Sequence, residues 1–381
     1  MKKFGSDSIR WLLTSLSAVV LVACGGGGGG GGEKPSTGNK TPTQVAQVTY
    51  PTDDNDARRF LTQATFGPTD DDVAELNTLG FEPWIAAQIA QAQKYPHTAY
   101  FDDRDKAMQV ASGSSAGFGE VVQSFWYSAM KSPDQLRQRV AFALSEIFVV
   151  SGADGCATNN PRGAAGYYDL LADNAFGNFR TLLEKVALHP VMGCYLSSLR
   201  NQRENSATGR VPDENFAREI LQLFSIGLYK LNLDGSLSLN DRKEPIETYN
   251  SEDVAGLAKV FTGLSFDCPD WPADSCFYWG HKDNIKYSDM WNRQMVWYPQ
   301  YHSYSGDKSF LGKTIKATAR PMPEADIKEA LDWIAQQHPN VGPFIGKQLI
   351  QRLVTSNPSP AYVGRVAAAF EASGRNLGEM V

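Results

Sequence analysis

Residues 132–150 read SPDQLRQRVAFALSEIFVV and indicate the fold class. Ser132 predicts a helix N-cap, Pro133 suits the first helical position, and Gln135 completes a capping box. The apolar residues that follow recur at the three- and four-residue spacing of one helical face; they are Leu136, Val140, Ala143, Leu144 and Ile147. We therefore expect an amphipathic helix that packs one face against other helices.

The same period recurs along most of the chain. Thr69 and Gly80 bracket a further helix, because threonine is a good N-cap and glycine commonly ends a helix. No run of strands with hairpin turns interrupts the pattern. The predicted fold is mainly α, a multi-helix globular domain with helical periods at residues 54–66, 82–93, 118–131, 163–175, 178–188, 251–263, 324–337, 341–354 and 360–373.

Two segments depart from this period. Residues 228–248 contain LNLDGSLSLN, which predicts a hairpin or loop with a turn at Asp234 and Gly235. Residues 264–320 form a long, partly irregular or β excursion. Such an aromatic-rich loop can build a ligand platform, or its large side chains can pin a long loop onto the helices. The aromatic residues are Trp271, Trp279, Trp291, Trp297, Tyr278, Tyr287, Tyr298, Tyr301 and Tyr304.

The first 23 residues have the pattern of a signal peptide. Lys2, Lys3 and Arg10 precede the apolar run WLLTSLSAVVLVA, which is too short to span a bilayer because a spanning helix needs roughly 20 residues. LVAC at residues 21–24 resembles the bacterial lipobox, which implies acylation, for example with palmitate, at Cys24. The glycine that follows implies sorting to the outer membrane. The alternative is simple cleavage and release.

The next segment predicts a tether. Residues 24–53 begin with the lipidated cysteine and eight glycines and continue with EKPSTGNKTPTQ, a composition that cannot bury a core. The helical domain then occupies residues 54–381. It ends where a new helix begins near Asn376, so we expect a C-terminal truncation. The predicted location is the outer membrane, with the domain facing the periplasm or the cell surface and a lipid anchor as the membrane contact.

Composition supports a folded domain behind the tether. The hydrophobic fraction is 42%, enough for a substantial core, and the formal net charge is -6. Removing the signal peptide removes three positive residues and one negative residue, which makes the charge -8. This balance argues against a nucleic-acid partner and against a second, electrostatic attachment to anionic lipid.

Four cysteines remain once Cys24 is lipidated. In an oxidising compartment an even number predicts disulfides, and four cysteines allow three pairings. We favour Cys268 with Cys276, because CPDWPADSC is a short turn-rich loop, and then Cys156 with Cys194. A zinc site would need more closely spaced cysteine pairs than this chain has.

The stretch PDENFAREILQLFSIG at residues 212–227 predicts another amphipathic helix. Its apolar arc holds Phe216, Ala217, Ile220, Leu221, Leu223 and Phe224, and its polar arc holds Glu214, Asn215, Arg218, Glu219 and Gln222. Glu214 and Arg218 are spaced to form an ion pair, which contributes about 0.2–0.5 kcal/mol when exposed. By periodicity alone, the polar arc is the solvated side of an ordinary helix.

This stretch and several others resemble the bacterial domain-of-unknown-function family 1800. The other blocks are YNSEDVAGLAKVFTGLSF, YHSYSGDKSFLGKTI, ARRFLTQATFGPT, RQRVAFALSEIFVVS, NAFGNFRTLLEKVALHPVMGCYLSSLRN and HPNVGPFIGKQLIQRLV, and together they run from about residue 54 to the C-terminus. The resemblance implies an exported, largely helical protein. It also implies an exported sulfatase-like partner, because genes of the two families often lie side by side. It carries over no catalytic residues.

The family's characteristic positions fall on polar residues and one glycine here. Many members have His-Asp where this chain has His302 and Ser303, and Asp307 is a candidate replacement for the missing carboxylate. A site that depends on that His-Asp pair is therefore in doubt. The positions are His189, Asn201, Glu214, Asn215, Arg218, Glu219, Asp253, Thr262, Gly263, His302 and Lys308.

These residue types support three hypotheses. One is a hydrolase or lyase that acts on an extracytoplasmic polymer by acid-base chemistry, with Glu219 held by Arg218 or Lys308 beside His302. Another is a protein that binds a polymer, either glycan or peptide, or the sulfatase-like partner. The third is a buried charge network with only a structural role. No cofactor is assigned, and no spaced metal-ligand motif predicts a metal site. The candidate binding residues are His189, Asn215, Asp253, Trp279 and Trp297.

One motif is weaker than it looks. GSSAG at residues 113–117 fits the G-x-S-x-G pattern of serine hydrolases, in which a buried strand delivers the serine onto a tight turn. Here DKAMQVAS precedes it within a helical protein. We therefore interpret GSSAG as a flexible connection.

Overall fold

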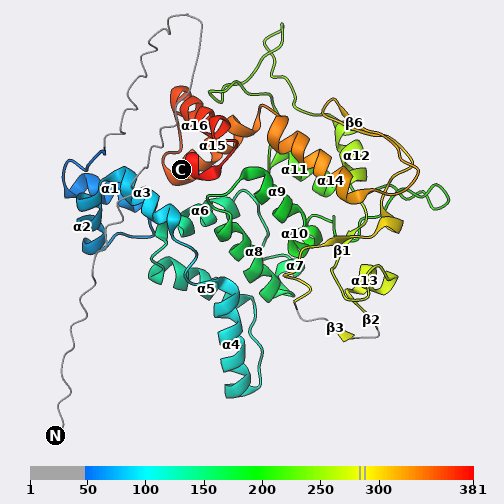
Figure 1. Cartoon of the computed structure of the whole chain (residues 1–381), viewed down its shortest axis with the longest axis horizontal. Coiled ribbons are helices and arrows are strands. Elements are labelled where there is room, and N and C mark those ends of the chain that lie inside the picture. The colour runs from blue at the N-terminus through cyan, green and yellow to red at the C-terminus, as the bar shows by residue number, and fades with distance from the viewer. Residues whose placement is uncertain (1–47, 283–284, 287–288) are drawn as a thin grey trace, which may run out of the picture. The chain divides into compact units, whose positions relative to one another are not determined.

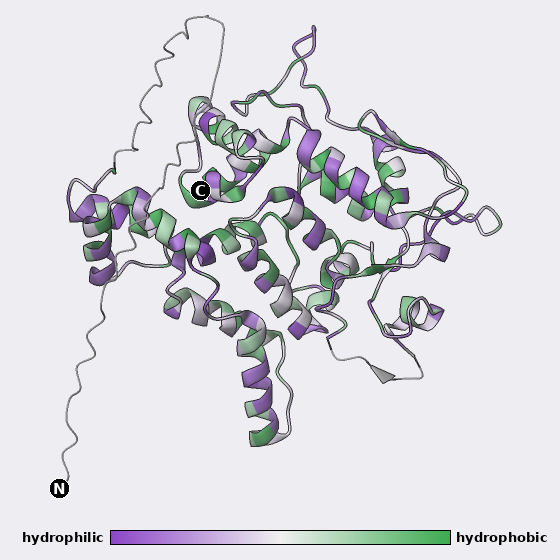
Figure 2. Cartoon of the chain, viewed as in Figure 1, coloured by the Kyte–Doolittle hydropathy of each residue, from purple (hydrophilic) through white to green (hydrophobic). Residues whose placement is uncertain are grey.

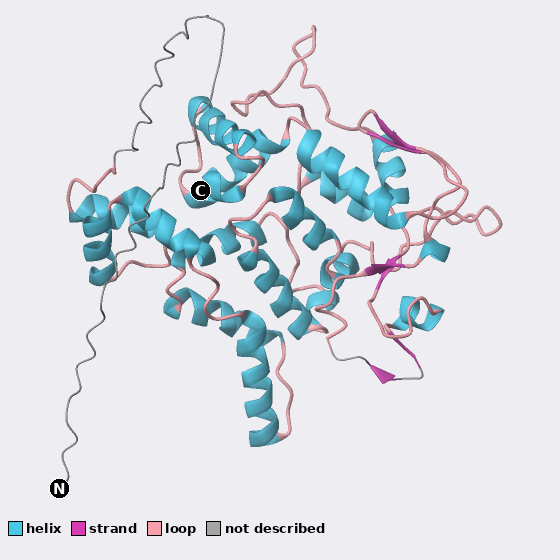
Figure 3. Cartoon of the chain, in the orientation of Figure 1, coloured by secondary structure: helices cyan, strands magenta, loops and turns pink. Residues whose placement is uncertain are grey.

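The computed structural model describes residues 48–282, 285–286 and 289–381. Within this part of the chain the fold is mainly α, as Figures 1 and 3 show. Figure 2 shows hydrophobic and hydrophilic residues alternating around single helices, as amphipathic helices require. The helices are α1 (Asp54–Ala64), α2 (Asp70–Leu79), α3 (Phe81–Ala90), α4 (His97–Ser112), α5 (Phe118–Lys131), α6 (Gln135–Ser145), α7 (Gly155–Thr158), α8 (Pro161–Asp173), α9 (Phe179–Ala187), α10 (Pro190–Tyr195), α11 (Asn215–Gln222), α12 (Ser251–Val260), α13 (Asp274–Trp279), α14 (Pro323–Asp332), α15 (Val341–Leu353) and α16 (Pro360–Ala372).

The strands are short and pair antiparallel. Leu264 in β1 (Leu264–Ser265) faces Trp297 in β4 (Val296–Trp297). β2 (His281–Lys282) pairs with β3 (Ile285–Lys286), and β5 (Lys308–Phe310) pairs with β6 (Lys313–Ile315). Three short helical turns complete the set: the 3₁₀ turns η1 (Pro299–Tyr301) and η3 (Leu377–Glu379), and the π-helical η2 (Trp333–Gln337).

The helix at residues 132–150 forms, but it begins later than predicted. Its five predicted apolar residues are buried, and they belong to the main core. The predicted N-cap is wrong, because α6 starts at Gln135 with Asp134 as its N-cap. Ser132 instead ends α5, where its amide donates to the Ser128 carbonyl oxygen at 2.9 Å. Its hydroxyl donates to Asp134, so this serine links two helices.

Other predicted helices form with shifted ends. The helices expected at residues 54–66, 82–93 and 251–263 end two or three residues early, at Ala64, Ala90 and Val260. The single helix expected at residues 324–337 is α14 followed by the π turn. The predicted cap of α2 is confirmed, since Thr69 forms a capping box with Asp72.

Helix α4 was not predicted. It carries the charged run DDRDK and buries only His97 and Phe101 among its sixteen residues, so its sequence lacks a clear apolar stripe. Figure 1 shows it extending past its neighbours at the bottom of the view. It also precedes GSSAG. A helix, rather than a buried strand, therefore leads into that motif, as its interpretation as a connection requires.

The two irregular segments are confirmed in outline. Residues 228–248 form loops with isolated bridges, and Gly235 adopts a left-handed φ of 76° at the predicted turn. The excursion contains β1 to β6 and α13. β5 packs on α12 so closely that a Cβ on Gly256 would lie 1.8 Å from the Ser309 carbonyl oxygen. The absence of a side chain at Gly256 therefore allows the excursion to pack closely against α12.

Both predicted disulfides are confirmed. Cys156 pairs with Cys194, and Cys268 pairs with Cys276. The first joins α7 to α10, and the second closes the loop that carries Trp271. The signal peptide, Cys24, most of the predicted tether and Tyr287 lie outside the described residues.

Candidate functional site

A buried polar cluster forms where the excursion meets α12 and α14. His302 follows η1, Lys308 opens β5, and both side chains are fully buried. Both contact Asp326 of α14: His302 Nε2 lies 2.9 Å and Lys308 Nζ 2.8 Å from Asp326 Oδ2. Two residues predicted as catalytic are therefore brought together by a carboxylate that the sequence analysis did not identify.

The second ring nitrogen of His302 has a partner as well. Nδ1 lies 2.8 Å from the carbonyl oxygen of Thr262, which follows α12. Because a carbonyl oxygen only accepts hydrogen bonds, the Nδ1 nitrogen is the donor in this contact. The imidazole is thus held between two elements that lie far apart in the chain.

Two opposing effects set the pKa of Asp326. Burial alone would raise it, but the hydrogen bond from His302 and the charge of Lys308 outweigh burial and hold the pKa below its usual value. Asp326 is therefore ionised at neutral pH. The negative charge of Asp326 therefore lies between His302 and Lys308 in the protein interior.

Asp326 could have been found from the sequence. The buried residues of α14 are Pro323, Asp326, Ile327, Ala330 and Leu331, which follow the spacing of one helical face. A carboxylate at an apolar position of a helix needs a partner, because an unpaired buried charge is costly. The place of Asp326 on the apolar face of α14 was therefore the sequence signal for a buried, paired carboxylate.

The neighbouring residue Ser303 joins a second carboxylate to the cluster. Its amide donates to Thr262 Oγ1 at 2.9 Å, and its hydroxyl donates to Glu204 Oε1 at 3.0 Å. The other oxygen, Glu204 Oε2, is buried and has no hydrogen-bond partner among the described residues. Asp307, the proposed replacement for the family's carboxylate, instead pairs with Lys316 at 2.8 Å. Glu204 therefore supplies the carboxylate beside position 303.

Helix α11 carries the other predicted catalytic residues. Arg218 pairs with Glu214 at 3.2 Å, and both side chains are 42% exposed. Glu219 is half-buried, and burial raises its pKa while Arg218 opposes the rise. Its Oε2 atom has no hydrogen-bond partner among the residues described. The ion pairs of Arg218 and Lys308 are thus made with Glu214 and Asp326, not with Glu219.

The apolar arc of α11 matches the prediction except at one residue. The predicted residues within the helix are buried, as is Phe224, whereas Leu223 is 43% exposed. Leu223 is the C-cap of α11, one residue past its last residue, Gln222. On the polar side, the Tyr249 hydroxyl donates to Gln222 Oε1 at 3.1 Å.

Two predicted binding residues have local structural contacts, and a third is exposed. His189 caps α10 by accepting from the Val191 amide at 3.3 Å, and burial lowers its pKa to about 3. Asp253 completes the capping box of α12 and also accepts from the Leu311 amide at 2.7 Å. Asn215 is exposed at the first position of α11.

The tryptophans of the excursion lie in different settings. Trp297 and Trp271 line a groove of about 880 Å³, whereas Trp279, at the end of α13, is 64% exposed and does not line it. The Trp271 indole donates to the Trp297 carbonyl oxygen at 2.9 Å. The Trp297 indole nitrogen is buried and lacks a hydrogen-bond partner within the described part of the chain. The groove also contains Pro299, Pro321, Met322, Asp267, Arg320 and Glu324.

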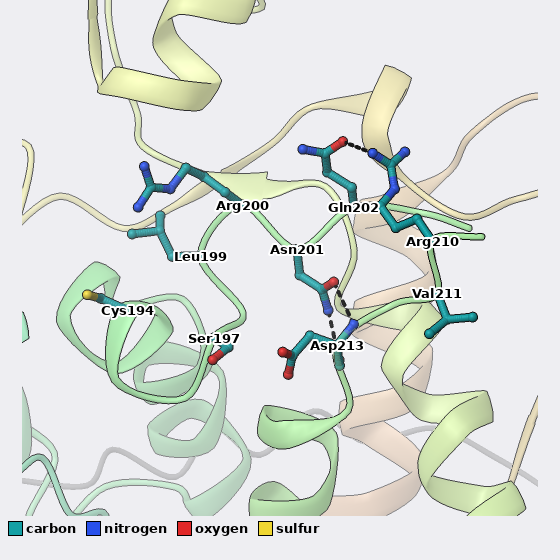
Figure 4. Close-up of a pocket in the computed structure, with 9 residues that line it drawn as sticks. All are labelled: Cys194, Ser197, Leu199, Arg200, Asn201, Gln202, Arg210, Val211 and Asp213. Atoms are coloured by element: carbon teal, nitrogen blue, oxygen red, sulfur yellow. Dashed lines mark hydrogen bonds between the residues drawn. The ribbon is translucent and has the colours of Figure 1, made fainter. Parts of the chain in front are cut away.

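A smaller, more polar pocket of about 390 Å³ lies beside the segment that follows α10 (Figure 4). Asn201, a characteristic family position, supports it: its Nδ2 donates to the Asp213 carbonyl oxygen and its Oδ1 accepts from the Asp213 amide, both at 2.9 Å. Arg200 and Arg210 also line it. These arginines are not among the residues predicted from the sequence to form a site.

Neither a membrane helix nor a metal centre is found in residues 48–282, 285–286 and 289–381. No helix there is both long and apolar enough to cross a bilayer. Over the same ranges, no group of three or more His, Cys, Asp or Glu residues is placed to hold a metal ion.

Together these features define a helical protein with two disulfides, a buried charged cluster and an aromatic groove. The chain belongs to the family described as "Protein of unknown function (DUF1800)", whose model matches residues 59–381. No curated protein matches it, and no solved structure does.

Proposed function

We propose that this protein is an exported, lipid-anchored binding protein that holds an extracytoplasmic glycan chain in the groove between Trp271 and Trp297. The observation that carries this proposal is the groove itself. Its volume of about 880 Å³ lies in the range of ligand sites, and Trp271 is 49% exposed. An exposed indole face can stack on the apolar face of a sugar ring.

The rim of the groove supports a glycan more than a purely apolar ligand. Asp267, Arg320 and Glu324 place charged and hydrogen-bonding groups beside the indoles, where sugar hydroxyl groups need partners. Proline-rich peptides also dock in aromatic grooves, so a peptide ligand is the outcome that would replace this one.

The buried cluster favours binding over acid-base catalysis. A catalytic acid or base must come within about 2.6–3.2 Å of the substrate or act through one water. His302 and Lys308 have no exposed surface, and Asp326 is 5% exposed. A polymer therefore has no direct access to these groups, which are arranged to hold the excursion on α12 and α14.

The proposal is tested by measuring the affinity of the mature protein for soluble neutral polysaccharides, using affinity electrophoresis and calorimetry. Trp271→Ala should weaken binding about tenfold, the loss of roughly one stacking contact. Trp279→Ala is the matched control, because its indole is exposed but outside the groove.

Equal affinity of the two variants would contradict the proposal, as would binding of a proline-rich peptide with no binding of any glycan. The sulfatase-like partner that the family resemblance implies is tested separately, by co-purification from solubilised envelopes with the tethered protein.

A further inference from the structure

The segment that borders the smaller pocket has a net positive charge, although the whole chain is negatively charged. Residues 200–211 read RNQRENSATGRV, and three arginines with one glutamate give a formal charge of +2, whereas the whole chain carries -6. Two of these arginines, Arg200 and Arg210, line the pocket. A local charge opposite to that of the whole molecule attracts anionic ligands to one place.

Both guanidinium groups are held by neutral partners. Arg200 Nη1 donates to the Tyr278 carbonyl oxygen at 2.9 Å. Arg210 Nε donates to the Arg203 carbonyl oxygen at 2.9 Å, and its Nη1 donates to Gln202 Oε1 at 2.6 Å. Among the described residues, neither arginine has a carboxylate within ion-pair distance. Their charges are therefore oriented but not neutralised.

The backbone that carries them is fixed and locally strained. Ser197 and Arg200 have left-handed φ angles of 64° and 67°, although neither is a glycine. Such a conformation is rare for residues other than glycine and persists where the surrounding structure imposes it. Here the Arg200 amide donates to the Leu264 carbonyl oxygen at 2.8 Å, and Asn201 holds the Asp213 backbone.

The positions of the two arginines indicate the shape of the ligand. Figure 4 shows Arg200 and Arg210 on opposite sides of Asn201, so a single small anion does not meet both. Asp213, the carboxylate of the pocket, accepts from the Asn215 amide at 2.9 Å and lies on the side of α11. A ligand that neutralises both arginines must carry at least two separated acid groups.

We propose that this pocket binds an acidic polymer through successive oxyanion groups, one on Arg200 and one on Arg210. Guanidinium groups suit this role, because their planar fork matches the oxygens of a carboxylate, phosphate or sulfate. Two contacts on one chain reinforce each other, since the second forms at high effective concentration. The pocket is separate from the aromatic groove, and this inference does not depend on the glycan proposal.

The test compares ligands on the intact mature protein by calorimetry at low salt. Tetragalacturonate and tetrapolyphosphate supply linked acid groups of two kinds, maltotetraose is a neutral chain, and inorganic phosphate is a single anion. We expect one or both acidic chains to bind at least tenfold more tightly than maltotetraose and inorganic phosphate. Added salt should weaken that binding, because the contacts are ionic.

Variants then locate the site. Arg200→Gln and Arg210→Gln should each weaken the acidic chain about fivefold, the effect of one partly exposed ion pair. Arg104→Gln on α4 removes the same charge from an exposed residue outside the pocket and should change nothing.

Equal losses in all three variants would overturn the inference, because the attraction would then be diffuse. Inorganic phosphate binding as tightly as the acidic chains would also overturn it. Trp271→Ala should leave acidic-chain binding unchanged, so the two proposals can fail independently.

Discussion

Asp326 provides the sharpest test of how this fold is held together. The variant Asp326→Asn keeps the size and shape of the side chain and removes its charge. His302 and Lys308 then remain fully buried without an anion. An isolated buried cation is costly, so the structure predicts a large loss of stability from a change of very few atoms.

The magnitude follows from the distance. At 2.8 Å and an effective dielectric constant of about 20, the attraction between Lys308 and Asp326 is about 6 kcal/mol before desolvation is subtracted. Removing one partner of a buried pair typically costs about 3–5 kcal/mol. We therefore expect Asp326→Asn to lower the free energy of unfolding by about 3–5 kcal/mol.

The assay is urea unfolding at pH 7, followed by circular dichroism with both disulfides intact. Asp307→Asn is the control, because its pair with Lys316 is exposed and exposed ion pairs contribute little to stability. The double variant Asp326→Asn with Lys308→Met should be more stable than the sum of the single losses predicts, since it leaves no lysine charge to compensate.

The pH dependence gives a second readout. The folded-state pKa of Asp326 is lowered, so its contribution is complete above the unfolded pKa of about 3.8 and is lost as the pH falls through the folded value. Wild type and Asp326→Asn should therefore converge in strong acid. The reasoning is refuted if Asp326→Asn costs no more than Asp307→Asn at pH 7.

Two further predictions follow from the packing. His189 has a folded pKa of about 3, below its ordinary 6.5, so the unfolded chain takes up the proton first, and stability should fall by roughly 2 kcal/mol from this group between pH 7 and pH 5. His189→Asn keeps a capping side chain and should flatten that part of the pH profile; an unchanged slope would contradict the assignment. Gly256→Ala should sharply reduce the yield of folded protein, because its Cβ would lie 1.8 Å from the Ser309 carbonyl oxygen, whereas Gly306→Ala has open space and should express normally. Thermal melting of purified Gly256→Ala and Gly306→Ala compares the stability of the two variants. Equal melting temperatures would show that α12 and β5 are not packed this closely.

Much of the local structure could be predicted because it depends on neighbours in sequence. The apolar stripe of α6 and the N-cap at Thr69 are local patterns, and both form. The Cys268–Cys276 pair also follows from a short loop. Where the prediction failed, a competing local contact explains it: Ser132 ends α5 instead of starting α6, and α4 has too few buried residues to show a stripe.

The site was predictable only in part. His302 and Lys308 were singled out through the family resemblance. The apolar face of α14 marks Asp326 as a carboxylate that needs a partner, but nothing in the sequence indicates that His302 and Lys308 are that partner. Of the two tryptophans predicted to bind a ligand, Trp297 lines the groove and Trp279 lies outside it, whereas Trp271, which was not among the candidates, lines it. Aromatic content alone does not say which ring faces a cavity.

The sequence by itself indicated the helical class, the favoured disulfide pairs and a long aromatic excursion, because helical period, short loops and composition are local quantities. The family followed from a resemblance between ordered blocks of sequence. Only the tertiary structure decided that Thr262, His302 and Asp326 meet, and that Arg200 lies beside a pocket. Such contacts join residues tens of positions apart. They arise from the packing of whole helices and strands, which no single stretch of sequence encodes.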